Sequence, residues 1–327
     1  MEWTVAIGVD THRDRHVAVA VDRLGRTLGS LELAVDERGY ARLIDFARSC
    51  GVPAFSVEGT GSYGASLARA LLAEGFVVYE CERPERRRRK DKNDLIDAEA
   101  AARRLLTGKR LPLPRTGGAR EQLRLLLAER RSCQRARLQA RNQLKAALVT
   151  LDPPQRARLS ALAPALLNRH ALVRCTPTLA ALGRLSKRIQ QLESELAEID
   201  AELATLTKAL CPQLLAQPGV GPVCAAQMLV SAADPARLRS EACFAALAGV
   251  SPVEASSGPT RRHRLNRGGD RQLNWALHMA ALNRIRHHPE TRAYYQRLLT
   301  NGKTKKEAIR NIKRVLARRL YHTLTAA

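Results

Sequence analysis

The stretch VAIGVDTHRDRHVAVAVD, residues 5–22, decides the fold of the N-terminal part of the chain. It contains two apolar runs, residues 5–9 and 17–21, separated by a short polar segment. Apolar runs of this length joined by polar residues are typical of a hairpin between two buried strands. We therefore expect paired strands at residues 5–10 and 16–21, and the first of them ends on a carboxylate, Asp10.

The residues that follow extend this hairpin into a larger sheet. A third strand is expected near residues 27–35, after which Asp36 can cap a helix with apolar residues on one side. A strand, a helix and a strand then follow at residues 54–58, 63–74 and 76–80. Three hairpin-linked strands followed by helix–strand alternation predict a mixed α/β sheet.

Beyond residue 107 the chain is predicted to be mainly helical. A linker rich in Pro and Gly leads into one long basic helix at residues 119–151. Apolar residues then recur at alternating steps of three and four, at Leu182, Leu185, Ile189, Leu192, Leu196, Ile199, Leu203, Leu206 and Leu210. This pattern predicts a coiled coil, either as an antiparallel hairpin with the preceding helix or as a surface for self-association.

The charge of the chain points to a polyanionic partner. Its 327 residues include 55 Lys and Arg against 31 Asp and Glu, a formal net charge of +24. Such a surplus attracts polyanions, of which nucleic acid is the usual one, although a ribosomal-type or merely soluble basic protein is the alternative. Because aromatic residues make up only 4%, stacking of bases on aromatic side chains is not prominent.

The cysteines and the first residues bear on the compartment. Seven cysteines stand singly without any C-x-x-C pair, which favours neither a zinc site nor a disulfide framework and fits a reducing cytoplasm. The N-terminus lacks the pattern of a secretory signal, and no apolar run is long enough to span a bilayer. We expect a soluble, cytoplasmic protein with no membrane partner.

Four acidic residues form the constellation that carries chemistry. Asp10 and Glu58 end predicted strands. Asp94 and Asp97 run into a helix expected at residues 98–106, and their i,i+3 spacing places both on one helical face. Four converging carboxylates repel one another unless cations neutralise them, and oxygen ligands suit Mg²⁺ or Mn²⁺. Two such ions can activate an attacking oxygen and stabilise a leaving oxygen at phosphorus.

Each of these acids also has a plainer interpretation. Taken singly, a strand-terminal Asp is often a turn residue, and Asp94 could simply cap its helix. The ordered set of four is more specific than its members, and it resembles a ribonuclease H-like metal site.

A basic run lies immediately before the last two carboxylates. It consists of Arg86, Arg87, Arg88, Arg89 and Lys90. Basic runs usually form solvated faces. Its position beside a predicted phosphoryl-transfer site favours binding of a nucleic-acid backbone.

Two further motifs lie in the C-terminal third. The sequence from Pro218 to Pro222 is typical of a helix-hairpin-helix turn, in which Gly219 and Gly221 permit a tight bend whose N–H groups can hold a phosphate. A plain helix–helix corner is the alternative.

The second motif pairs serines with arginines. Ser256 and Ser257 precede four arginines, Arg261, Arg262, Arg264 and Arg267. A serine becomes a nucleophile only when a base, a metal or cationic neighbours lower the cost of losing its proton. The arginines can instead hold a phosphate and stabilise developing charge. Helices are expected at residues 271–286 and 303–320, and the second carries basic residues suited to phosphate contact.

Together these motifs resemble the DEDD-type transposases of insertion sequences, the insertion-sequence one-ten family. The resemblance covers nearly the full chain. It rests on Gly8-Val9-Asp10, on Glu58-Gly59 before Tyr63-Gly64, on Lys92-x-Asp94-x-x-Asp97-Ala98, on Pro218-Gly219-Val220-Gly221-Pro222, and on Ala248-Gly249-x-x-Pro252 followed by Ser257-Gly258.

The resemblance implies an architecture and partners. It implies a ribonuclease H-like (RuvC-like) α/β domain at residues 1–107, a helical coiled-coil region at 108–210, and a mainly α C-terminal transposase domain with a helix-hairpin-helix at 211–327. The tetrad becomes Asp10, Glu58, Asp94 and Asp97, and the serine that links to DNA matches Ser257, with Ser256 adjacent. A guide (bridge) RNA encoded by the element, homo-oligomers (dimer or tetramer) with composite sites, and a place on the prokaryotic nucleoid when active are also implied.

We therefore expect a metal-dependent, RNA-guided DNA recombinase that mobilises its own element. One alternative is a junction resolvase or structure-selective endonuclease on the same core, which hydrolyses DNA without a covalent intermediate. The other is a non-enzymatic DNA-architectural protein whose acidic residues are structural. The complete, ordered tetrad argues against the latter.

Overall fold

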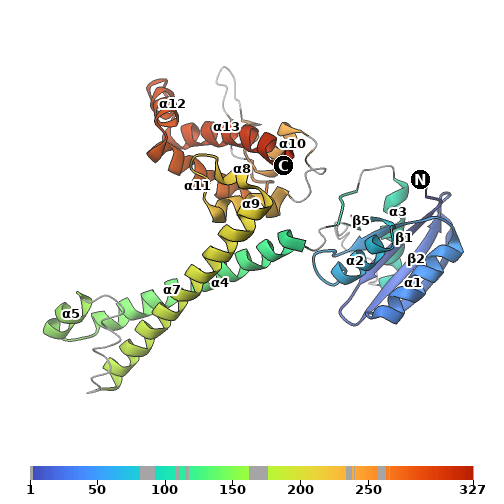
Figure 1. Cartoon of the computed structure of the whole chain (residues 1–327), viewed down its shortest axis with the longest axis horizontal. Helices are drawn as coiled ribbons and strands as arrows, with labels where there is room; N and C mark the ends of the chain where they lie inside the picture. Colours follow the sequence, from blue (N-terminus) through green and yellow to red (C-terminus); the bar gives the residue numbers. More distant parts are fainter. Residues whose placement is uncertain are drawn as a thin grey trace. The chain divides into compact units, whose positions relative to one another are not determined.

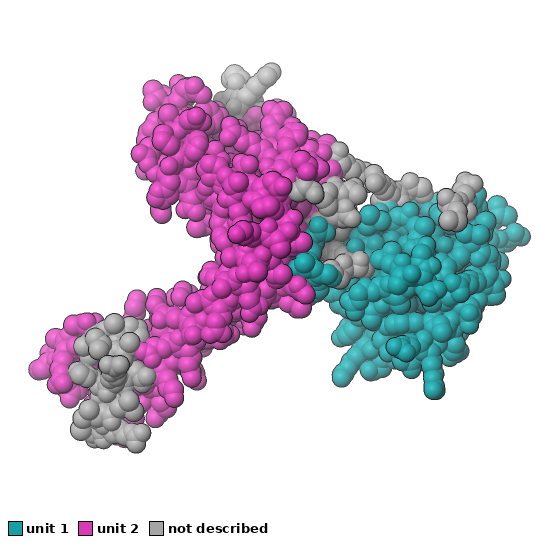
Figure 2. Space-filling view, viewed as in Figure 1, with its two compact units in different colours: residues 1–121 teal, residues 122–327 magenta. Residues whose placement is uncertain are grey.

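The protein divides into two compact units. A computed structural model describes residues 3–81, 93–107, 111–114, 118–161, 176–232, 238, 240–255, 263–264 and 266–326. The first unit comprises residues 1–121 and the second residues 122–327 (Figure 2). Among the described helices, none combines the length and the apolar character that crossing a membrane requires.

The first unit is built on a five-stranded mixed sheet. Its strands are β1 (Val5–Thr11), β2 (Arg15–Asp22), β3 (Thr27–Ala34), β4 (Pro53–Glu58) and β5 (Val77–Cys81), and its helices are α1 (Glu37–Cys50), α2 (Ala65–Ala73) and α3 (Asp94–Leu106). The strand order is β3-β2-β1-β4-β5. The first three strands pair antiparallel with one another, whereas β4 runs parallel to β1 and β5 parallel to β4. The predicted mixed α/β sheet is confirmed.

Helices cover both faces of this sheet. Successive residues of a strand point to opposite faces, so Ile7 and Val9 face one way while Ala6 and Gly8 face the other. Ile7 and Val9 share a buried cluster with residues of α1 and α2, such as Leu43. Ala6 shares a second buried cluster with residues of α3. The unit therefore has three layers, with α1 and α2 on one side of the sheet and α3 on the other (Figure 1).

Gly8 sets how closely α3 approaches the sheet. A Cβ atom placed on Gly8 would lie 2.0 Å from the carbonyl oxygen of Ala98 and 2.2 Å from the backbone nitrogen of Ala102. Both alanines are fully buried on α3. Only glycine on the strand, facing small residues on the helix, permits this contact. The spacing between β1 and α3 therefore depends on a single residue.

The described part of the second unit is helical apart from one small hairpin. Its elements are α4 (Gly118–Val149, with its first residues in the first unit), α5 (Pro153–Ser160), α7 (Pro177–Leu210), α8 (Pro212–Leu215), α9 (Pro222–Ala232), α10 (Glu241–Leu247), β6 (Val253–Glu254), β7 (His263–Arg264), α11 (Arg271–His287), α12 (Pro289–Thr300) and α13 (Lys305–Thr325). The strands β6 and β7 pair antiparallel. The predictions at residues 271–286 and 303–320 correspond to α11 and α13.

Helices α4 and α7 lie side by side and run antiparallel (Figure 1). Arg130 of α4 donates two hydrogen bonds to Asp200 of α7, and Arg141 pairs with Glu193. Farther along, Leu148 shares a buried cluster with Leu182 and Ile189. The apolar pattern of α7 is thus used within the chain, as in the hairpin alternative, although Leu210 is exposed. Self-association stays a prediction.

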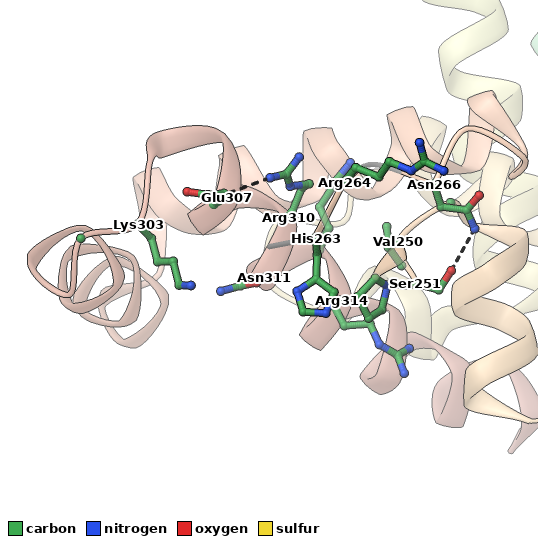
Figure 3. Close-up of a pocket in the computed structure, with 14 residues that line it drawn as sticks. Val250, Ser251, His263, Arg264, Asn266, Lys303, Glu307, Arg310, Asn311 and Arg314 are labelled. Carbon is green, nitrogen blue, oxygen red and sulfur yellow. Dashed lines mark hydrogen bonds and ion pairs between the residues drawn. The ribbon is translucent and has the colours of Figure 1, made fainter. Parts of the chain in front are cut away.

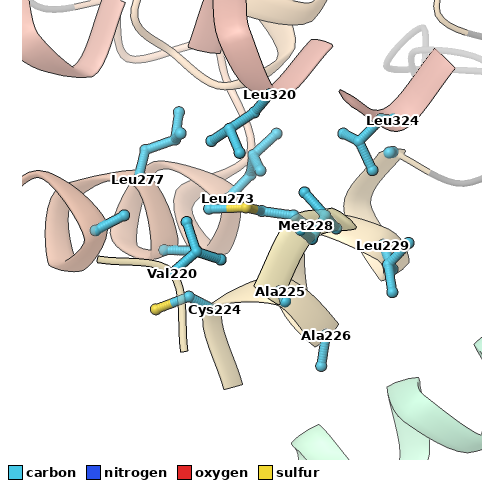
Figure 4. Packing of buried hydrophobic residues seen from close by; sticks show 14 of the residues in the cluster. Val220, Cys224, Ala225, Ala226, Met228, Leu229, Leu273, Leu277, Leu320 and Leu324 are labelled. Atoms are coloured by element: carbon cyan, nitrogen blue, oxygen red, sulfur yellow. The ribbon is translucent and has the colours of Figure 1, made fainter. Parts of the chain in front are cut away.

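A large apolar core holds the C-terminal helices together. Figure 4 shows part of it, where Met228 of α9, Leu273 and Leu277 of α11 and Leu320 of α13 converge. Leu123 and Leu127 of α4 belong to the same cluster. This core fixes α13 against α9 and α11, and therefore fixes the polar face that α13 presents beside α11.

Candidate functional site

The strand geometry brings Asp10 and Glu58 to the same edge and the same face of the sheet. Strands β1 and β4 are parallel neighbours whose last pair is Val9 with Val57, so Asp10 and Glu58 follow directly where this pairing stops. Alternation along the strands places both on the α3 side, the side that Gly8 faces. The Thr11 hydroxyl donates to the Glu58 carbonyl oxygen at 2.9 Å and ties the two strand ends together.

Helix α3 supplies the other two carboxylates from its first turn. It begins at Asp94, four residues earlier than the predicted start at Ala98. Its N-cap is Asn93, whose side chain accepts a hydrogen bond from the Leu95 N–H at 3.0 Å. Asp94 is therefore not the cap, and the interpretation of Asp94 as a simple capping residue is wrong. Asp94 and Asp97 can instead lie near the sheet, beside the positive end of the helix dipole.

His12 is a component of the site that the sequence analysis missed. Its Nε2 atom lies 3.1 Å from Asp10 Oδ2 and 3.3 Å from Asp94 Oδ2. Arg15 also reaches Asp94, at 3.2 Å, and Glu32 at 3.0 Å. A signal was present, because His12 follows Asp10 by two residues and such residues share a face of an extended chain.

The electrostatics of Asp10 reflect the gathering of acids around it. Asp10 is 7% exposed. Burial raises the pKa of Asp10, the charge of His12 lowers it, and the negative charges of Glu58, Asp94 and Asp97 raise it further. All three other acids therefore lie close enough to repel the Asp10 carboxylate. Asp10, His12 and Asp94 lie together, and Glu58 and Asp97 lie near enough for their charges to act on Asp10.

This arrangement is suited to a divalent cation. One ligand atom from each of Asp10, His12 and Asp94 lies within 4.8 Å of the other two. A cation placed among them would relieve the repulsion that raises the pKa of Asp10, and carboxylate oxygens are the donors that Mg²⁺ and Mn²⁺ prefer. The imidazole nitrogen adds a donor of a kind more common around transition metals. The donor set thus fits a divalent cation.

The two glycines of the predicted helix-hairpin-helix differ in their surroundings. Gly219 has a φ of +80°, and a Cβ there would lie 2.7 Å from Arg284 Cγ and 2.8 Å from the Ala280 carbonyl oxygen of α11. Arg284 also donates from Nη1 to the Pro218 carbonyl oxygen at 3.3 Å. Gly219 is thus required for packing. Gly221 is exposed, and a Cβ added to it would meet no described atom within 4 Å, so its face is open to a ligand.

The remaining predicted residues fall into two groups. Arg264 and Arg267 are described and exposed, with Arg264 on β7. The others lie outside the described residues, namely Arg86, Arg87, Arg88, Arg89, Lys90, Ser256, Ser257, Arg261 and Arg262. In the sequence, Ser257 falls between β6 and β7.

Two family models match this chain in the order of its two units. One, described as "Transposase" and built on the DEDD transposases of IS110, matches residues 7–153 and includes Asp10, Glu58, Asp94 and Asp97. The other, described as "Transposase IS116/IS110/IS902 family", matches residues 211–296 and includes Ser257. The chain belongs to the IS110 family of transposases.

Individual relatives agree with this assignment. The chain is 32% identical to the insertion element IS110 uncharacterized 43.6 kDa protein of Streptomyces coelicolor, over 40% of this chain and 33% of that protein. It is 25% identical to the insertion element IS116 uncharacterized 44.8 kDa protein of Streptomyces clavuligerus, over 94% of this chain and 91% of that protein. A probable family 20 transposase of Pseudomonas aeruginosa is 27% identical over 57% of each chain. The match to the first of these relatives spans only about a third of its length.

Proposed function

We propose that this IS110-family chain is a DNA transposase or recombinase that mobilises an insertion sequence by metal-dependent cleavage and strand exchange. The observation that carries the proposal is the cluster of Asp10, His12 and Asp94, whose ligand atoms lie within 4.8 Å of one another, with Glu58 and Asp97 near enough to raise the pKa of Asp10. A mixed sheet whose first three strands are antiparallel and whose last two are parallel supports a ribonuclease H-like catalytic domain. The net charge of +24 supports DNA as the substrate.

Four residues of the first unit would hold the metal. They are Asp10, Glu58, Asp94 and Asp97, with His12 bridging two of them. A bound Mg²⁺ or Mn²⁺ polarises a phosphoryl oxygen and stabilises developing negative charge. The chain's own contribution is position, because Gly8 seats α3 on the sheet and Thr11 joins the ends of β1 and β4.

In this proposal Ser257 of the second unit is the nucleophile. Its Oγ atom forms a bond to the phosphorus of the scissile phosphodiester, and the bond from phosphorus to a deoxyribose oxygen breaks. The serine proton is lost and the departing oxygen gains one. The serine phosphodiester retains the energy of the broken bond, so rejoining to a new strand requires no nucleotide hydrolysis. Arg264 and Arg267, a few residues farther along the chain, would stabilise the charge on phosphorus.

The proposal includes two kinds of partner. A guide (bridge) RNA from the element would pair with donor and target DNA, which fits the low aromatic content and the basic composition. A homo-oligomer, dimer or tetramer, would bring the acids of one protomer to the serine of another, and the α4–α7 hairpin is a candidate surface for that contact. The protein would act on the nucleoid.

The experiment that tests the proposal uses purified protein, element-end and target DNA, the element RNA and Mg²⁺. We expect strand exchange in the wild type and a covalent protein–DNA adduct that survives denaturation. Ser257→Ala should abolish both while DNA binding is retained, with Ser256→Ala as the matched control. Recombination that persists in Ser257→Ala with Ser256 intact would discard this nucleophile.

A structure-selective endonuclease is a second candidate, favoured by one observation. The acids Asp10, Glu58, Asp94 and Asp97 all belong to the first unit, so a hydrolytic site would need no residue of the second. In that case DNA would be hydrolysed without an adduct, and Ser257→Ala would cut as well as the wild type. The adduct assay therefore separates the two candidates.

A further inference from the structure

Helix α13 lines a cavity built from residues of the second unit alone. The cavity has a volume of about 410 Å³. Its walls are the segment from Gly249 to Pro252, the strand β7, Asn266 and the first turns of α13. Figure 3 shows side chains of β7 and of α13 pointing toward this common space.

The cavity wall is strongly cationic. Five Lys and Arg side chains line it, Lys303, Arg264, Arg310, Lys313 and Arg314, together with His263. Glu307 is the one carboxylate among the described lining residues, and it is already engaged. It forms a capping box with Thr304, accepting hydrogen bonds from the Thr304 N–H at 2.9 Å and from its hydroxyl at 2.7 Å. Glu307 also lies 4.0 Å from Arg310, so one carboxylate faces five Lys and Arg side chains.

Lys313 is the most unusual of these cations. It is 5% exposed, and its Nζ donates at 2.8 Å to Asn274 Oδ1, a neutral acceptor. Burial and then the charge of Arg310 lower the pKa of Lys313. Buried ammonium groups are ordinarily paired with an acid. Within the described part of the chain, no carboxylate lies within ion-pair distance of Lys313.

Arg314, the next residue of α13, also has a buried cationic nitrogen. Its Nη1 atom is buried and has no hydrogen-bond partner among the described residues. An unsatisfied buried donor costs about 1–3 kcal/mol. Two adjacent residues of α13 thus carry buried positive groups that an acceptor in the cavity would satisfy.

The position of Lys313 is fixed by the surrounding backbone. The Asn274 amide that receives Lys313 also donates to the Ala248 carbonyl oxygen at 2.7 Å and to the Gly249 carbonyl oxygen at 3.3 Å. Gly249 has a φ of +64°, and a Cβ on Gly269 would lie 2.3 Å from the Gly249 backbone nitrogen. This close crossing of two loops holds the cavity wall in place before any ligand binds.

We propose that this cavity binds a phosphate group of a nucleic-acid backbone, with Lys313, Arg314 and Arg310 as its principal contacts. The described lining contains several cations and no Phe, Tyr or Trp, which suits a phosphodiester better than a base. The inference deepens the proposed function and rests on it for the occupant, a DNA or RNA strand held at the root of the hairpin that leads to Ser257. It assigns the principal contacts to α13, with Arg264 of β7 also on the cavity wall.

The test measures binding of a 20-nucleotide single-stranded DNA and of the matching RNA to the full chain in EDTA. The pocket variant is Lys313→Met with Arg314→Gln. The control is Lys305→Met with Lys306→Gln, which removes the same charge from exposed residues of α13 that do not line the cavity. Fluorescence of Trp275 during thermal unfolding checks that both variants fold.

We expect the pocket variant to bind about tenfold more weakly, and the slope of log K against log salt to become shallower by about one, as for one lost phosphate contact. The control should change affinity by a much smaller factor. Weaker binding of DNA, of RNA or of both by the pocket variant supports the site and shows which of the two nucleic acids occupies it. Equal effects in the two variants, or unchanged binding, would overturn it.

A single neutral methylphosphonate moved along the oligonucleotide sharpens the result. At one position it should weaken the wild type but leave the pocket variant unaffected, because that variant has already lost the contact. Since EDTA excludes metal-dependent chemistry, failure here leaves the proposed recombinase untouched. If the wild type bound the oligonucleotide and the pocket variant bound it more weakly, but no strand exchange occurred, the result would count against the proposed function alone.

Discussion

The two units of this chain each gather charges of one sign, and the sign is opposite in the two units. In the first unit, acids gather around the buried carboxylate Asp10. In the second, cations gather around the buried amine Lys313. Each group is held by a glycine contact, Gly8 against α3 and Gly269 against Gly249. A buried charge with charges of the same sign around it is unfavourable, so each site suits a ligand of the opposite charge, which we propose to be a cation in the first unit and a phosphate in the second.

In both units, charges of one sign held in place by tight packing mark a site for a ligand of the opposite sign. A protein that neutralised both groups internally would be more stable and would bind neither ligand. At functional sites, proteins retain such unneutralised groups although they lower the free energy of unfolding. We expect the stability and ligand binding of the two sites to respond separately, and to ligands of opposite charge.

The largest effect is expected from Mg²⁺ on the first unit. The chain has two tryptophans, Trp3 in the first unit and Trp275 in the second, so variants with either one replaced by Phe report one unit each. At a Mg²⁺ concentration one hundred times its dissociation constant, the Trp3 transition should gain about 2.7 kcal/mol. The Trp275 transition should not move.

Asp10→Asn should remove the Mg²⁺ response of Trp3, and Asp14→Asn, which changes an exposed acid on the turn between β1 and β2, should retain it. A Mg²⁺ response of equal size in both units would show that the ion acts on the chain generally, and would remove the distinction between the sites.

A smaller effect is expected from Gly8→Ala. The added methyl group cannot fit against Ala98 and Ala102, so α3 must move away from β1, at a cost of about 1–3 kcal/mol. Gly61→Ala is the matched control, since a Cβ there would meet no described atom within 4 Å. Unfolding followed through Trp3 measures both. If the two variants proved equally stable, the close approach of α3 would not be what positions Asp94 and Asp97.

The smallest effect has the opposite sign. Lys313→Met should stabilise the second unit by about 1 kcal/mol, because it replaces a desolvated charge with an apolar chain of similar length. Burial lowers the pKa of Lys313 below 10.5, so the unfolded chain binds more protons as the pH approaches that value. Wild-type stability should therefore rise relative to the variant between the lowered pKa and 10.5. Thermal unfolding at several pH values, followed through Trp275, measures this, and a destabilised variant would contradict it.

Much of the first site could be predicted from the sequence. Asp10 and Glu58 both end apolar strands, and parallel pairing of neighbouring strands brings such ends together. The predicted start of α3 comes too late in the chain because charged residues dominate the first turn of the helix. Asn93, a residue well suited to N-caps, marks the true start.

The second site could not be predicted in the same way. Lys313 and its acceptor Asn274 are 39 residues apart, and only tertiary packing joins them. The strands β6 and β7 have two residues each, too few to give a periodic signal. One signal was present, since Lys313 lies on the same stripe of α13 as Ile309 and Leu316. A lysine on the apolar stripe of a helix is expected to be buried, and the count of lysines alone does not reveal this.

We propose that Asp10, Glu58, Asp94 and Asp97 together hold one cation centre. The most direct measurement is anomalous X-ray scattering from crystals of the protein grown with Mn²⁺. We predict a strong anomalous peak bonded to oxygens of Asp10 and at least one of Asp94 and Asp97, absent in crystals of Asp10→Asn. Well-ordered crystals with Mn²⁺ bound elsewhere and none between these carboxylates would contradict the account.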